Sequence, residues 1–301
     1  MSTSEKTITR RDALLAAGAV GAVGAAAVGT AGVIGLARGE KRDTAGLTLR
    51  APRISKVPEA DPEAEAWAGA PDVVLALQAQ RVAPPRLETL AVAELRARAL
   101  HDGKRLAFRL SWEDESVDDL DGVGRYHDAV AVMLPVRKDA NPAITMGTGD
   151  VPVHILQWRA TWERDLAGKT GVDQIHPNVV HDVMPDDVLP EATADLYWVG
   201  RTAGNPLSQV KRTTSVEQIV AAGPGTSTHI ASSDATGKGV HDGATWTVSI
   251  SLPLARPEGG DRLEPGSTWQ AAFAVWRGDQ RNRGSRKHYA DWVPLVLEAT
   301  L

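Results

Sequence analysis

The feature that most constrains the fold is a strict alternation of apolar and other residues in short segments bounded by turns. Residues 105–112 place four apolar side chains on one face: Leu106, Phe108, Leu110 and Trp112. Residues 95–100 precede them, and the turn His101-Asp102-Gly103-Lys104 joins the two segments. A side-chain period of two is typical of a strand with one buried face, and Asp-Gly favours a tight β-turn. The pattern therefore predicts a β-hairpin.

Further apolar or alternating segments recur along the chain. They are 73–77, 128–135, 151–162, 243–252, 269–276 and 291–297. The 28 glycines and 18 prolines that punctuate the chain suit short strands and loops better than a helical bundle. Residues 168–215 are rich in Asp, Pro and Asn and predict long loops with one or two short helices. The expected fold is mainly β, an antiparallel β-sandwich with long loops and a few short helices.

The N-terminus has the pattern of an export signal. Residues 9–15 contain the pair Arg10-Arg11 ahead of an uncharged run from Ala13 to Ala37, which resembles a twin-arginine signal. We therefore predict export to the periplasm or to the outer face of the cytoplasmic membrane. Ala25-Ala26-Ala27 offers a cleavage pattern, but a retained segment 13–37 would exceed the roughly 20 residues that cross a bilayer and would give membrane association.

Three regions follow from this division of the chain. Residues 1–40 are a signal or N-terminal anchor, residues 41–65 a polar, Pro-containing linker that leads into the fold, and residues 66–301 the sandwich domain. Neither a pI near 5.9 nor the absence of a long basic run suggests nucleic-acid binding.

The chain contains no cysteine. Its absence excludes disulfides, iron–sulfur clusters held by thiolates and the C-x-x-C-H attachment of a c-type haem. A haem would therefore be held non-covalently, and any metal ion would need His, Met, Lys or carboxylate ligands.

A series of short motifs carries a resemblance to a known family. In chain order they are Leu106–Asp114, Tyr126–Val132, Pro142–Gly147, Val151–Ala160, Gly237–Gly239 with Asp242–Val248, Phe273–Gly278 and Arg286–Trp292. Together they resemble the haem-binding gamma subunits of the ethylbenzene dehydrogenase, dimethylsulfide dehydrogenase, selenate reductase and chlorate reductase group. The chain departs from that group at Arg277, where an acidic residue is usual, and at Leu252, where an arginine is frequent.

The resemblance implies a function and a set of site residues. It implies haem b whose iron is held by Met146 and Lys287. Trp158, which lies in a neighbouring motif, and Arg286, next to Lys287, are further candidates for the pocket, with core packing the alternative for Trp158. Two protein ligands would fill both axial positions, so the chain would transfer electrons and have no catalytic residues of its own. The implied partners are a molybdopterin catalytic subunit and an iron–sulfur subunit, with a cytochrome or a quinone-linked carrier as the external redox partner.

Without the resemblance, the two ligand residues admit ordinary alternatives. Met146 lies in a polar, Gly-rich turn, where the residues alone leave packing and ligation both open. Lys287 lies in a basic loop, and a ligating lysine would have to lose a proton whose usual pKa is about 10.4. His288 is the nearest substitute for Lys287, while His154 is more simply a core or rim histidine. Met133 is expected in the core, and Met184 in packing or an interface.

Two other classes of function compete with electron transfer. The chain could instead be a stand-alone extracellular β-sandwich module that binds a carbohydrate or haem, and the nine tryptophans could form a row that stacks sugars. A hydrolase is disfavoured because G-x-S-x-G, H-E-x-x-H and P-loop motifs are absent, and His176 and His181 are a weak metal pair. The loop residues Asn178, Asn205, Asp186 and Asp187 fit either a partner surface or a solvated loop.

Overall fold

The predicted hairpin lies in the smaller of two sheets in the computed structural model. It consists of β4 (Glu94–His101) and β5 (Arg105–Glu113), and the Asp102 carboxylate closes its turn by accepting 2.8 Å hydrogen bonds from the amides of Lys104 and Arg105. Gly103 supplies the positive φ, +83°, that such a turn requires. The sheet order is β10-β11-β5-β4-β2, with antiparallel pairing throughout. The other strands are β10 (Thr236–His241), β11 (Thr245–Pro253) and β2 (Val73–Ala76).

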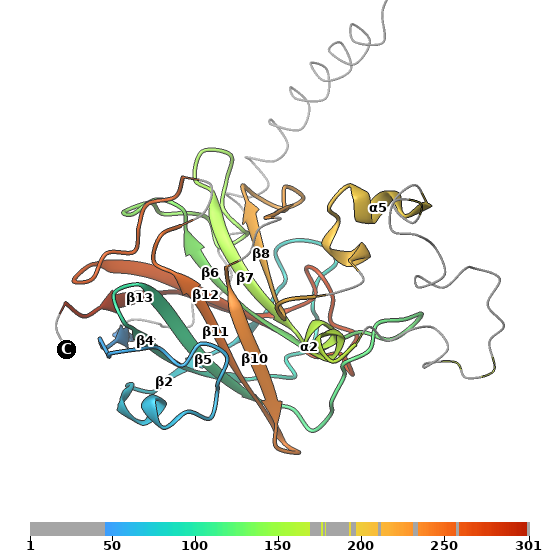
Figure 1. Cartoon of the computed structure of the whole chain (residues 1–301), viewed down its shortest axis with the longest axis horizontal. Coiled ribbons are helices and arrows are strands. Elements are labelled where there is room, and N and C mark those ends of the chain that lie inside the picture. Colours follow the sequence, from blue (N-terminus) through green and yellow to red (C-terminus); the bar gives the residue numbers. More distant parts are fainter. Residues whose placement is uncertain are drawn as a thin grey trace, which may run out of the picture. The chain divides into compact units, whose positions relative to one another are not determined.

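The larger sheet has the order β1-β13-β12-β6-β7-β8-β9, and β3 pairs with β13 beside this path. All of its pairs are antiparallel except β1 with β13. Its strands are β1 (Leu49–Ala51), β3 (Gln78–Ala79), β6 (Ala129–Pro135), β7 (Val153–Arg159), β8 (Val216–Ala221), β9 (Thr228–His229), β12 (Thr268–Trp276) and β13 (His288–Leu297). Figure 1 shows the two sheets packed face to face, which confirms the predicted mainly β, antiparallel sandwich.

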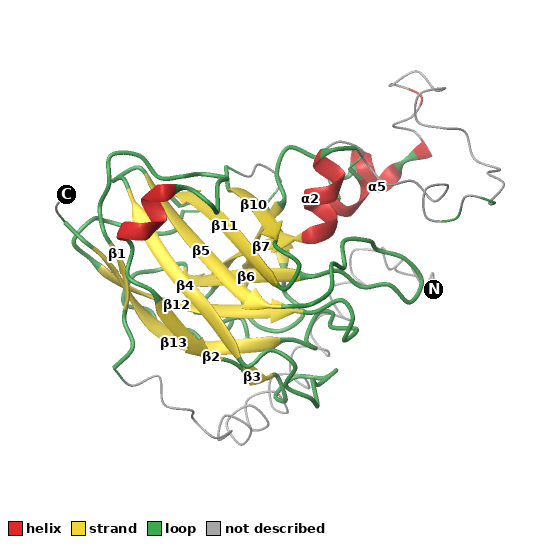
Figure 2. Cartoon of the chain, turned by 90° about the horizontal axis from the view of Figure 1, so that it is seen from below, coloured by secondary structure: helices red, strands yellow, loops and turns green. Residues whose placement is uncertain are grey.

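The structure describes residues 46–168, 176, 178, 193, 197–209, 212–230, 234–256 and 259–299. In these ranges the helices are short: η1 (Glu65–Gly69), α2 (Ala160–Leu166), α5 (Val199–Thr202) and η2 (Pro206–Ser208). Figure 2 shows α2 beside the ends of β7 and β10. No helix in the described ranges is long and apolar enough to span a bilayer. The predicted signal, together with Met184, His181, Asp186 and Asp187, lies outside the described residues.

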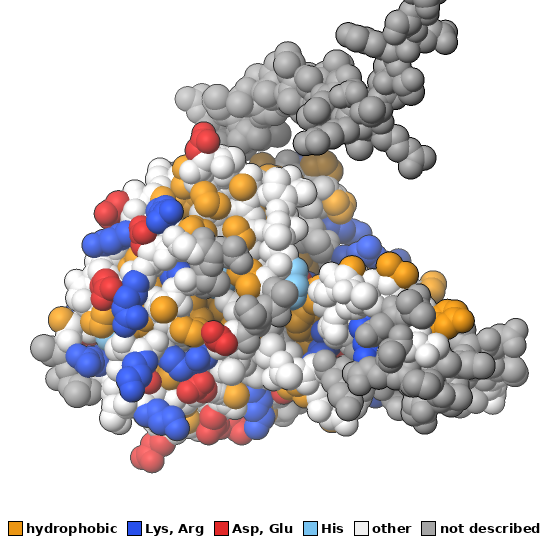
Figure 3. Space-filling view, turned by 45° about the horizontal axis from the view of Figure 1, so that its top comes forward, with side chains coloured by type: hydrophobic (Ala, Val, Ile, Leu, Met, Phe, Trp, Pro, Cys, Tyr) orange, Lys and Arg blue, Asp and Glu red, His pale blue; other side chains and the backbone are white. Residues whose placement is uncertain are grey.

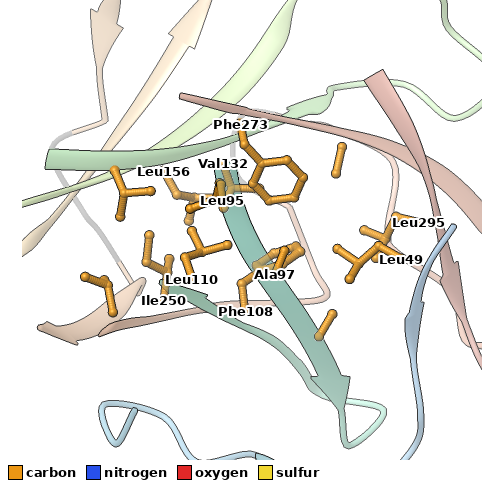
Figure 4. Close-up of a cluster of buried hydrophobic side chains, with 14 of the residues drawn as sticks. Leu49, Leu95, Ala97, Phe108, Leu110, Val132, Leu156, Ile250, Phe273 and Leu295 are labelled. Atoms are coloured by element: carbon orange, nitrogen blue, oxygen red, sulfur yellow. The ribbon is translucent and has the colours of Figure 1, made fainter. Parts of the chain in front are cut away.

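The core lies between the two sheets. The four alternating residues of β5 and their counterparts on β11, Trp246, Val248, Ile250 and Leu252, all belong to it, as predicted. Figure 4 shows Phe108 and Leu110 of the smaller sheet pointing toward Phe273 and Leu156 of the larger one. Each fully buried side chain of this size stabilises the fold by roughly 1.5–3 kcal/mol.

Some elements differ from the sequence prediction. Residues 41–65 are not only a linker, because β1 adds a parallel strand to β13 and buries Leu49 and Ala51 completely. The segment predicted as a strand over 151–162 ends at Arg159 and continues as α2. The sequence pattern does not predict strands β8 and β10.

Candidate functional site

An apolar cluster covers the outer face of the larger sheet, away from the core. Five alanines form its floor: Ala129, Ala131, Ala221, Ala272 and Ala274. Met133, Val153, Ile155 and Trp276 complete the buried set, and Ile144, Met146, Ile219, Tyr289 and Trp292 pack against it. The outer face of a sandwich is ordinarily polar, because water contacts it. We call this cluster the outer platform.

The strand register explains the flat floor. On β12 and β6 the residues that face outward are paired as Ala274 with Ala131 and Trp276 with Ala129. The alternate residues, including Phe273 and Val275, face the core. Small side chains side by side on adjacent strands leave room for a broad, flat group above them. This also explains the imperfect alternation of β6 and β7, whose two faces are both apolar.

Met146 reaches the outer platform from a constrained turn in the loop between β6 and β7. Its φ is +70°, a conformation that is uncommon for a non-glycine residue and often marks a functional site. The turn is fixed by hydrogen bonds from the Gly147 amide to the Ala143 carbonyl (2.8 Å) and from the Gly223 amide to the Met146 carbonyl (2.9 Å). A Cβ at Gly147 would lie 2.5 Å from the Val151 carbonyl oxygen, so the turn accepts only glycine there. A flexible thioether is therefore held at a defined place on the platform.

Lys287 lies immediately before β13, and its amine is near the same platform. The Nζ atom is 5.2 Å from the centroid of the Trp276 ring. No carboxylate in the described residues forms an ion pair with it. Although Lys287 keeps part of its surface exposed, burial of the amine lowers its pKa to about 8. The site thus holds a lysine that loses its proton more readily than an exposed one.

Two hydrogen-bond donors near Lys287 lack partners. The Nε1 of Trp292, which packs on the outer platform, and the Nε of Arg286 are buried without an acceptor. By contrast, Trp276 donates its indole N–H to the Gly284 carbonyl at 3.0 Å. Buried polar groups are ordinarily paired, so the two unpaired donors point to an acceptor that a ligand would supply.

The structure places Met146 and Lys287 against the same cluster, but it does not place Trp158 with them. Trp158 is fully buried between the sheets, where its ring contacts Trp112 and Trp246 and its N–H bonds to Glu163 at 2.8 Å. Core packing accounts for this tryptophan, and the predicted pocket role finds no support.

The histidines named as alternatives face inward. His288 accepts a hydrogen bond from the Ala91 amide (3.0 Å) and lies 3.3 Å from the Val275 carbonyl, so both ring nitrogens have partners. His154 is 1% exposed and lies on the opposite face of β7 from Val153 and Ile155. The described residues contain no group of three or more His, Asp or Glu that could hold a metal ion.

A buried ion pair borders the outer platform. Arg159 and Glu217, on neighbouring strands, form this pair, and Arg159 also lies 5.1 Å from the Trp162 ring.

A separate surface hollow of about 300 Å³ is lined by loop residues, including the charged residues Asp118, Arg125 and Asp279, and contains neither Met146 nor Lys287. Figure 3 shows one face of the molecule, with hydrophobic side chains over its middle and charged ones along its left and lower margins.

A comparison of the sequence with known families settles its relationship. The sequence pattern of the family described as Ethylbenzene dehydrogenase matches residues 64–288. The chain belongs to this ethylbenzene dehydrogenase family. The match includes both Met146 and Lys287, and it ends on the first residue of β13.

Two known proteins resemble this chain at low sequence identity. A protein of Haloferax mediterranei, described as a heme subunit of a respiratory nitrate reductase, is 26% identical over 233 residues, 77% of this chain and 66% of that protein. The chain thus spans just under two thirds of this relative. The Chlorate reductase subunit gamma of Ideonella dechloratans is 25% identical over 271 residues, 85% of this chain and 91% of the relative.

The solved structures that align with this chain resemble it only distantly. A family 9 carbohydrate-binding module of Caldicellulosiruptor kristjanssonii in complex with glucose aligns at a TM-score of 0.38 and 8% identity, covering 84% of this chain and 97% of that one. Its cellotriose complex gives a TM-score of 0.37 at the same identity, over 85% and 95%. Likeness at this level says nothing about ligands. All nine tryptophans lie within the described residues and none is fully exposed, which disfavours a row of sugar-stacking rings.

Proposed function

We propose that this chain is a non-covalent haem b-binding subunit that transfers electrons and carries out no substrate chemistry of its own. The observation that carries the proposal is that Met146 and Lys287, far apart in sequence, both lie against the outer platform. The family relationship supports it, as do the names of the two relatives, a heme subunit and a gamma subunit of reductases.

The residues of the platform fit a haem. The alanine floor suits a flat macrocycle, and the Met146 thioether and the Lys287 amine are a soft donor and a nitrogen donor that would hold its iron. The unpaired donors of Arg286 and Trp292 would bind the carboxylates at the edge of the group. When bound, the haem iron supplies a one-electron couple between its ferric and ferrous states, and two protein ligands exclude substrate from the metal.

The lowered pKa of Lys287 makes ligation less costly. A lysine must be neutral to bind a metal ion. Since one pKa unit corresponds to 1.36 kcal/mol, removing the proton at pH 7 costs about 5 kcal/mol for an unperturbed lysine and only about 1 kcal/mol when the pKa is about 8. The buried amine therefore needs a smaller contribution from the metal bond.

The partners and location belong to the same proposal. The chain would assemble with a molybdopterin catalytic subunit and an iron–sulfur subunit, and exchange electrons with a cytochrome or a quinone-linked carrier. The names of the relatives, which are subunits of reductases, support the assembly. The Arg10-Arg11 pair supports export by the twin-arginine route. Replacing both arginines by lysine should leave a tagged chain in the cytoplasm, and co-purification of the tagged wild type should recover the two partners.

Absorption and EPR spectra of the purified protein test the ligand pair. The wild type should show a sharp Soret band and a low-spin haem signal, whereas Met146→Ala and Lys287→Ala should each lose the low-spin signal. Lys104→Ala, in the exposed hairpin turn, is the matched control and should keep the wild-type spectrum. Low-spin wild-type spectra from both ligand variants would refute the assignment.

A further inference from the structure

A second site lies at one end of the sandwich, on the opposite face of β7 from the outer platform. Arg256 follows β11 closely and is only 9% exposed, and none of its three guanidinium nitrogens has a hydrogen-bond partner. His154, on the inner face of β7, is 1% exposed, and neither of its ring nitrogens has a partner. Two side chains that are both at least nine-tenths buried thus leave all their polar atoms unpaired.

The two side chains are close enough to influence each other. Burial lowers the pKa of His154 to about 3, and the charge of Arg256 acts in the same direction, against a smaller opposite effect of Gln218. Burial also lowers the pKa of Arg256 to about 10, so the guanidinium remains charged at neutral pH. The effect of Gln218 is that of a side-chain hydrogen bond to the imidazole, although neither ring nitrogen of His154 has a partner at good hydrogen-bond geometry.

No acidic residue in the described part neutralises Arg256. The acid whose charge acts on it is Asp261, but the Asp261 carboxylate is already engaged by the Arg137 guanidinium and the Lys138 amide, each at 2.9 Å. Gly260 packs closely against Arg256, because a Cβ at Gly260 would lie 3.0 Å from the Arg256 Cβ and 3.2 Å from the Val136 carbonyl oxygen. An unpaired buried charge is strongly unfavourable, so a folded chain that keeps one there ordinarily has an opposite charge beside it.

We propose that Arg256 and His154 form a binding site for one small carboxylate or oxyanion. The planar guanidinium offers parallel N–H donors that match two oxygens of such an anion, and the imidazole N–H adds a third donor. The near-complete burial of both residues limits the ligand to about the size of formate or sulfate. Since the site lies on the inner face of β7, the ligand is a free anion and not part of a group on the outer platform.

Thermal unfolding of the full chain without haem tests the site. Sodium formate or sodium sulfate, titrated at constant ionic strength against sodium chloride, should raise the Tm along a saturating curve. At a hundredfold excess over Kd the rise should be about 5–10 °C. Arg256→Met should abolish it, whereas Arg262→Met, which removes an exposed arginine paired with Glu264, should retain it. Equal rises in wild type and Arg256→Met, or no saturating rise, would overturn the proposal.

Two further measurements keep the result independent of the stability of the variant. Selenate, located by its anomalous scattering in crystals of the wild type, should lie beside Arg256. The titration repeated on haem-loaded protein should give the same saturating rise. If the rise in Tm appears only in the absence of haem, the Arg256 guanidinium binds a carboxylate of the haem. A separate anion site would then be refuted.

Discussion

Replacing Gly147 by alanine tests whether the turn that carries Met146 is as constrained as its geometry indicates. Gly147 has a φ of +80°, and an alanine in this region costs about 1–2 kcal/mol. The added Cβ would lie 2.5 Å from the Val151 carbonyl oxygen, so the turn must also shift by at least about 0.5 Å to reach the shortest separation that real Cβ atoms show. Together these effects predict a loss of about 2–4 kcal/mol and a displaced Met146.

Two other glycines separate the contributions. Gly225 has a φ of +84° but no atom within 4 Å of a built Cβ, so Gly225→Ala should cost only the backbone strain of about 1–2 kcal/mol. Gly149 has neither a positive φ nor a close neighbour, and its alanine variant should stay within about 0.5 kcal/mol of wild type. Urea unfolding of haem-free protein gives the stabilities, and Soret titration gives the haem affinity. The reasoning fails if Gly147→Ala and Gly225→Ala have the same unfolding free energy and the same haem affinity.

Three further predictions concern the platform and the core. Because the pKa of Lys287 is lowered to about 8, haem affinity should rise about tenfold per pH unit up to pH 8 and then level off. The haem-free protein should gain stability between about pH 8 and 10.4, where the amine binds fewer protons in the folded than in the unfolded chain. A haem affinity that stays constant in Soret titrations from about pH 6 to 9.5 would contradict this. Ala274→Leu should raise the Kd for haem at least tenfold and cost no more than about 2 kcal/mol of stability, and Gln270→Leu, on the same strand, should bind haem normally. Gly239→Ala, whose Cβ would overlap the Trp158 ring, should destabilise the fold by about 1–3 kcal/mol in urea and leave the haem spectrum unchanged.

The fold could be predicted wherever the two faces of a strand carry residues of different polarity. The residues of β5 alternate because only one set meets the core, and the Asp102-Gly103 turn fixes the hairpin register. Strand β10 could not be found in this way, since Gly237 and Gly239 give it no apolar alternation. These glycines are needed because a Cβ at either position would collide with Val216 or Trp158 across the sandwich. Close packing between sheets thus removed the pattern that identifies a strand.

The site was predictable only in part. Motif order singled out Met146 and Lys287 in the sequence, but nothing in the sequence told which face of the sheet they share. Met133 is buried, as its place in the apolar run of β6 predicts, but the residues of that strand alternate between the two faces, and Met133 belongs to the outer platform. An unbroken apolar strand next to alanines at alternate positions on its neighbour was the signal that the outer face was also buried.

An apolar outer face has a consequence for stability. The inner face of the larger sheet is covered by the smaller sheet. On the outer platform, within the described part of the chain, individual side chains pack against the alanine floor: Ile144 and Met146 from a loop, and Ile219, Tyr289 and Trp292 from neighbouring strands. Alanines bury little area each, and loop contacts are replaced more easily than a packed sheet. A ligand that binds the folded platform and not the unfolded chain would stabilise the fold in proportion to the logarithm of its concentration over Kd. On the proposed function, haem would also cover the outer face of this sandwich, and loss of Met146 or Lys287 should lower the thermal stability of the loaded protein toward that of the same variant without haem.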